Sequence, residues 1–158
     1  KLTPSRYQDL RGADMPVRRE PGVEARVIAG RSGDVVGSAQ SHSPVMMLDI
    51  RLEPGAEFIQ DIPAGFNGFL YVIDGEGTFG ATATQGGPDA TLWMERKAED
   101  SVVSITAATA LHVILLAGAP LNEPVAARGP FVMNTEVELD EAMHDYRAGG
   151  FGAPFSAP

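Results

Sequence analysis

The 158-residue sequence has no cysteine, three histidines and one tryptophan. The lack of cysteine excludes disulfides, thiolate nucleophiles and cysteine-ligated zinc. Although 44% of the residues are hydrophobic, no apolar run approaches the roughly 20 residues that a membrane-spanning helix needs. The length suits one hydrophobic core and is too short for two, so we expect a single domain.

Basic residues are scarce, because 12 lysines and arginines stand against 21 acidic residues and leave a formal net charge of −9. This charge repels polyanions and predicts no direct binding to nucleic acid or to anionic membranes. The absence of cysteine fits a reducing compartment, so we expect the cytoplasm, or the nucleus in a eukaryote. Because the chain starts at Lys1 without a leader segment, we expect a cut or processed end.

Short β-type runs recur after residue 23 and are separated by turns rich in glycine and proline. The expected strands are 24–29, 45–52, 69–73, 91–94, 101–105 and 112–117. This rhythm predicts an all-β sandwich or barrel rather than a helical or βαβ fold. Residues 1–23 contain four arginines and three prolines with few apolar neighbours, which predicts an extended arm or linker.

One helix is expected over residues 135–149, followed by a flexible tail over residues 150–158. Thr135 and Glu138 have the spacing of a capping box, and two glycines at 149 and 150 end the helix. Apolar residues recur inside it at helical spacing: Leu139, Ala142, Met143 and Tyr146.

The sequence either lacks the familiar catalytic motifs or contains them where the neighbouring residues do not suit their function. Residues 75–80 match G-x-G-x-x-G, but the segment after them cannot begin a helix, so we interpret them as a turn between strands. The histidines lack the spacing that presents two imidazoles to one metal, and His112 is expected to be a hydrogen-bonded barrel residue. The carboxylates of the first half, Asp49, Glu53, Glu57 and Asp61, are expected to be solvated surface charges without a catalytic partner.

Two segments near the end of the chain, 121–125 (LNEPV) and 128–135 (RGPFVMNT), resemble a signature of the pirin family. Further collinear similarity runs through 6–10, 49–56, 71–77 and 145–147. The resemblance implies a cupin β-barrel, a jelly-roll-like double-stranded β-helix, over residues 24–134, closed by the helix at 135–149. The signature residues expected at an interface are Glu123, Pro124, Gly129, Pro130, Phe131, Val132, Met133 and Asn134.

Pirins are two-barrel cupins whose first barrel binds one metal, usually iron, through three histidines and one glutamate. Several have quercetin 2,3-dioxygenase activity, and others are transcription coregulators. The resemblance begins at the linker after the first barrel, so this chain is expected to be the second barrel. The missing N-terminal cupin half is then its partner, with the iron and a flavonol substrate bound there.

The cupin pattern also predicts that this half is metal-free. The first cupin motif, counted from Gly55 to Gly75, has Asp61, Pro63 and Gly68 at its His, His and Glu positions. Proline and glycine offer no side-chain donor, and His112 is the one residue of the second motif that survives. We therefore expect no catalytic residue, metal or cofactor in this chain, which alone should be inactive.

Three roles follow from this interpretation. The first is a structural half that shapes the interface and the pocket mouth of a quercetin 2,3-dioxygenase. The second is an acidic protein-interaction module of a transcription coregulator. The third is a barrel that binds a small apolar ligand in its own interior, with Trp93 as reporter. The run 131–133 is expected to pack in the core before the helix, or between the halves, rather than to contact substrate. The isolated chain is expected to self-associate.

Overall fold

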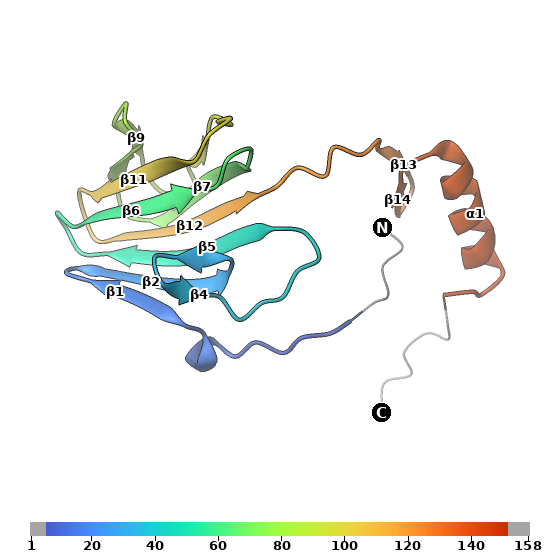
Figure 1. The fold of residues 1–158 in the computed structure, drawn as a ribbon, viewed down its shortest axis with the longest axis horizontal. Helices are drawn as coiled ribbons and strands as arrows, with labels where there is room; N and C mark the ends of the chain where they lie inside the picture. The colour runs from blue at the N-terminus through green and yellow to red at the C-terminus, as the bar shows by residue number, and fades with distance from the viewer. Residues whose placement is uncertain (1–5, 152–158) are drawn as a thin grey trace. The chain divides into compact units, whose positions relative to one another are not determined.

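The computed structural model describes residues 6–151, which fold into two compact units. The first unit spans residues 7–120, and the second contains Arg6 and residues 121–151. The first unit is built from two antiparallel sheets that lie as layers on either side of a common core (Figure 1). No helix within residues 6–151 is long and apolar enough to cross a membrane.

The larger sheet has six strands in the order β1-β2-β5-β12-β7-β10. Their bounds are Val17–Glu20 (β1), Val23–Ala29 (β2), Val45–Leu52 (β5), Leu111–Gly118 (β12), Asn67–Asp74 (β7) and Thr91–Trp93 (β10). The smaller sheet has the order β6-β11-β8-β9. Its strands are Glu57–Ile62 (β6), Ser101–Ala107 (β11), Gly77–Phe79 (β8) and Thr84–Gly86 (β9). A two-stranded hairpin, β3 (Arg31–Ser32) and β4 (Val35–Val36), and a 3-10 turn, η1 (Gly12–Asp14), complete the unit.

Alternation along the strands builds the core between the two sheets. In β12, Leu111, Val113, Leu115 and Ala117 are buried, while the residues between them are half-buried on the other face. Period-two alternation is what a pleated strand with one core face requires. Each fully buried Val or Leu contributes about 1.5–3 kcal/mol by its burial. The all-β fold with one C-terminal helix, expected from the sequence, is confirmed.

The expected arm over residues 1–23 includes a strand that the sequence did not suggest. β1 pairs along its whole length with β2, from Val17 opposite Arg26 to Glu20 opposite Val23. Arg18 anchors it further, because its Nη1 donates to Ser32 Oγ at 3.1 Å and its guanidinium lies 4.7 Å from the centre of the Phe58 ring. The backbone and side-chain hydrogen bonds thus draw part of the predicted arm into the sheet.

A buried polar network continues from Arg18. Ser32 Oγ donates to Gln60 Oε1 at 2.6 Å, and Gln60 Nε2 donates to the carbonyls of Arg31 at 3.1 Å and Asp61 at 2.9 Å. Ser32 and Gln60 are the buried polar residues of the described chain, at 0% and 1% exposure. Since a buried amide must be hydrogen-bonded, the network ties β3 and β6 together.

The turn after β7 confirms the interpretation of the glycine-rich motif. Gly75 has a φ of +83°, in the left-handed region that favours glycine, and the chain continues into β8 rather than a helix. The motif therefore joins two strands.

The second unit begins earlier than the sequence suggested, since residues 121–134 belong to it and not to the barrel. It contains a hairpin of β13 (Ala126–Arg128) and β14 (Phe131–Met133), followed by α1 (Glu136–Arg147). The predicted capping box is confirmed: Thr135 Oγ1 accepts from Glu138 N at 3.2 Å, and Glu138 Oε2 accepts from Thr135 N at 2.8 Å. The short hairpin escaped prediction because turns and prolines surround it.

The run 131–133 was expected to pack in a core, and it does so only in part. The Phe131 ring lies 5.8 Å from the rings of both Tyr146 and Phe151, whereas Val132 is 52% exposed. The reason is the strand alternation, which turns Val132 away from the helix side. Of the expected tail, residues 152–158 lie outside the described part.

Candidate functional site

The four positions aligned with cupin metal ligands do not converge. β6 buries Phe58, Gln60 and Ile62, so Asp61 projects from the opposite, exposed face. Pro63 follows the end of β6, and Gly68 is buried on β7. His112 lies on the outer face of the larger sheet. Within residues 6–151 no group of three or more His, Cys, Asp or Glu could hold a metal ion.

His112 is engaged in a contact of its own. Its Nε2 lies 2.7 Å from Asp49 Oδ1, and Arg26 Nη1 lies 3.6 Å from Asp49 Oδ2. The expectation of a hydrogen-bonded barrel residue is confirmed. Asp49, expected to be a solvated charge, is instead a partly buried partner of both side chains, because the register places Asp49 opposite Arg26.

Gly68 sits where no side chain fits. A β-carbon at this position would lie 2.7 Å from the Leu116 carbonyl oxygen and 2.8 Å from Ala117 Cβ, and it would also meet the methyl group of Met94. A carboxylate ligand at position 68 would therefore displace backbone. The thioether of Met94 fills this space, so the residues present do not fit an iron ion here.

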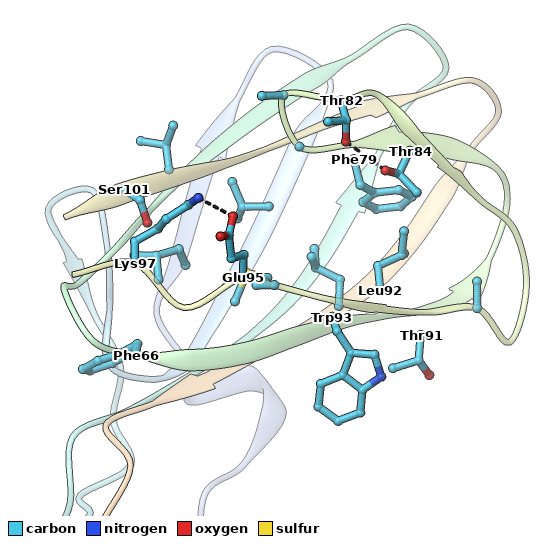
Figure 2. A pocket seen from close by; sticks show the side chains of 18 of the residues that line it. Phe66, Phe79, Thr82, Thr84, Thr91, Leu92, Trp93, Glu95, Lys97 and Ser101 are labelled. Atoms are coloured by element: carbon cyan, nitrogen blue, oxygen red, sulfur yellow. Dashed lines mark hydrogen bonds and ion pairs between the residues drawn. The ribbon is translucent and has the colours of Figure 1, made fainter. Parts of the chain in front are cut away.

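A cavity of about 730 Å³ opens between the two sheets, where their edge strands β9 and β10 are not paired with each other. Its inner wall is apolar and includes the buried residues Leu70 and Val103. Phe79, also buried, and the half-buried Leu92 belong to the same wall (Figure 2). Pro63 also lines it. A concave apolar space of this size is typical of a small-molecule site.

Polar groups gather at the rim of the cavity. Glu95 and Lys97 form an exposed ion pair, and the hydrogen bond from Lys97, followed by its charge, lowers the pKa of Glu95. The hydroxyl oxygens of Thr82 and Thr84 lie 3.0 Å apart (Figure 2). The Trp93 side chain points away from the cavity (Figure 2), so the expected reporter faces the outer side of the sheet.

That outer side carries an apolar row across four strands. Trp93 is paired with Phe69, Phe69 with Leu116, and Leu116 with Met47, on β10, β7, β12 and β5. We call these four residues the outer row. Trp93 is 78% exposed and its ring centre lies 5.1 Å from that of Phe69, while the other three are half-buried.

Tyr71 and Ile114 form the next pair on this face. Tyr71 Oη donates to Asp89 Oδ1 at 2.7 Å. This hydrogen bond, followed by the negative charge of Asp89 and by burial, raises the pKa of Tyr71 above its ordinary value of 10.0. The tyrosine therefore holds its proton and serves as a donor at neutral pH.

A family model described as the pirin C-terminal cupin domain matches residues 47–152. The chain belongs to the pirin family. A pirin-like protein of Solanum lycopersicum is 37% identical over 152 residues, which are 96% of this chain and 52% of that protein. A putative quercetin 2,3-dioxygenase of Pseudomonas aeruginosa is 35% identical over 153 residues, with the same two shares.

The crystal structure of a quercetin 2,3-dioxygenase from Acinetobacter baumannii superimposes with a TM-score of 0.85 at 33% identity, covering 97% of this chain and 53% of that one. The pirin domain thus spans about half the length of the relatives that it matches. The family and the cupin fold expected from the sequence are both confirmed.

The pirin signature forms local structure in the second unit. Gly129, with a φ of +60°, and Pro130 make the turn between β13 and β14. Asn134 Nδ2 donates to Glu123 Oε2 at 3.1 Å, and Asn134 N donates to Glu138 Oε2 at 2.9 Å. In this pirin domain the signature therefore shapes a hairpin and the start of α1.

Proposed function

We propose that this chain is the structural second cupin of a two-barrel quercetin 2,3-dioxygenase and packs against its N-terminal cupin half through the outer row. The N-terminal half would hold the iron and the flavonol. This half would shape the interface and the mouth of that pocket. Its own ligand positions support this division, since Asp61 and His112 project from different sheets and Gly68 has no room for a side chain.

The observation that carries the proposal is the chemistry of the outer face. An antiparallel sheet with one solvated face normally alternates apolar and polar residues. Here Trp93, Phe69, Leu116 and Met47 occupy that face in one continuous row. Trp93 is exposed in this row and the other three side chains are half-buried, so the sheet presents an apolar strip with an exposed tryptophan, a residue enriched at the energetic centres of interfaces. The same row would account for self-association of the isolated chain.

Binding of the separately produced N-terminal half of the same protein tests the interface. We expect Trp93→Ala to weaken binding measured by calorimetry about 30-fold or more, as for a central interface residue. Val102→Ala is the matched control, because Val102 is 62% exposed on the smaller sheet. Equal losses in both variants, or no loss in either, would refute docking through the outer row.

Activity tests the division of labour. The two halves together should cleave quercetin, whereas this chain with added iron should not. Stoichiometric iron binding and quercetin cleavage by this chain alone would overturn the proposal.

The net charge of −9 favours a second role, in which the acidic surface docks a transcription factor or another basic protein. Such binding would fall steeply with salt and would persist in Trp93→Ala, since charge and not the outer row would hold the partner. Flavonol turnover by the complete protein would favour the enzymatic role instead.

A further inference from the structure

The inner wall of the cavity between β9 and β10 is separate from the outer row. Trp93 belongs to that row and also borders the cavity, but its side chain points away from the cavity (Figure 2). Along this segment Ala90, Leu92 and Met94 pack against the core and line the cavity. Thr91 and Trp93 alternate with them and are exposed. The two faces of one strand thus present two different surfaces.

We propose that the cavity binds a neutral and mostly apolar small molecule that carries hydroxyl groups. The apolar part would lie against Phe79, Leu92 and Leu70, which form the inner wall. The size agrees, because about 730 Å³ falls within the range of small-molecule sites.

The charges of the cavity decide that the ligand is neutral. Among the described residues that line it, the charged ones are Glu95 and Lys97, and these pair with each other at the exposed rim. An ionised ligand would lose its hydration on entering the apolar interior, and neither Glu95 nor Lys97 is free to pair with it. Burial of such an unpaired charge costs free energy. Hydroxyl groups, in contrast, would meet hydrogen-bonding partners at the rim, where Thr82, Thr84 and Ser101 lie (Figure 2).

Titration with 2-naphthol, a neutral bicyclic aromatic with one hydroxyl, tests the site. The NMR signal of the Met94 methyl group should shift with saturation at one molecule per chain, with a dissociation constant on the order of 100 μM for so small a probe. The Met143 methyl group, on α1 in the other unit, is the internal control and should not shift. An unshifted Met94 signal up to the solubility limit of the probe would overturn the proposal.

Two substitutions separate the cavity from the exposed surface. Ala90→Phe places a ring inside the cavity and should weaken 2-naphthol binding by about tenfold or more, whereas Ala108→Phe places the same ring at an exposed position that does not line the cavity and should change binding little. Equal affinities in two folded variants would show that the probe binds elsewhere, and the proposal would fail. If Ala90→Phe does not fold, the Met94 titration still decides.

A charged probe of the same shape tests the ligand class. 2-Naphthoate should bind about tenfold more weakly than 2-naphthol, because its carboxylate would be desolvated without a partner. Naphthoate binding of equal strength would overturn the assignment of a neutral ligand. None of these measurements depends on the N-terminal half, so failure here leaves the proposed docking role standing.

Discussion

Replacement of Ser32 by alanine should lower the free energy of unfolding by about 2 kcal/mol, because it leaves buried polar groups without partners. The hydroxyl donates to Gln60 Oε1 at 2.6 Å and accepts from Arg18 Nη1 at 3.1 Å. Gln60 is 1% exposed, so water cannot readily replace the lost donor. Arg18 keeps other partners, among them Glu20 and the Ile59 carbonyl, so most of the loss falls on Gln60.

Urea denaturation followed by circular dichroism measures this effect, with the slope of the transition expected to stay unchanged. Ser41→Ala is the matched control. Ser41 is exposed and its hydroxyl donates to the Ser43 carbonyl at 2.6 Å, so its loss should cost no more than about 0.5 kcal/mol. A Ser32→Ala variant as stable as the Ser41→Ala variant would refute the claim that the network stabilises the barrel.

Two further predictions concern the larger sheet. Asp89→Asn should lower the pKa of Tyr71 in an ultraviolet titration of tyrosinate, since it removes the carboxylate that raises this pKa. Because the pKa of Tyr71 is raised in the folded state, its hydrogen bond contributes fully to the free energy of unfolding below the ordinary pKa of 10.0. That contribution is lost as pH rises through the folded-state pKa. An unshifted tyrosinate titration in Asp89→Asn would contradict this account. Gly68→Ala should destabilise by about 1–3 kcal/mol in thermal unfolding, because its β-carbon would lie 2.7 Å from the Leu116 carbonyl oxygen. Gly12→Ala, where no atom lies within 4 Å of the added carbon, should be near neutral, and equal effects of the two would disprove the steric argument.

Counting residues along the cupin motif does not show which side chains of a strand face the core. Counting from Gly55 placed Asp61 and Pro63 at the histidine positions, but in β6 it is Gln60 and Ile62 that face the core. Side chains alternate between the faces of a strand, so a shift of one residue exchanges inside and outside. Local sequence does not fix that phase, because it depends on the pairing of β6 with β11.

Local patterns along the chain were enough to predict these elements and the family. Apolar alternation located six strands, the Thr135 capping box located the helix, and collinear motifs identified a pirin domain. These features depend on neighbours within a few residues, where spacing is decisive.

The surfaces on which the proposals rest form only when the strands are assembled into sheets. Strand register brings residues 47, 69, 93 and 116 together in the outer row. Folding likewise brings residues 18, 32 and 60 together in the polar network. No local sequence pattern predicts either arrangement. The cavity arises because β9 and β10 end different sheets. Register and sheet order are set by the packing of the whole core, so they appear only when the chain is folded.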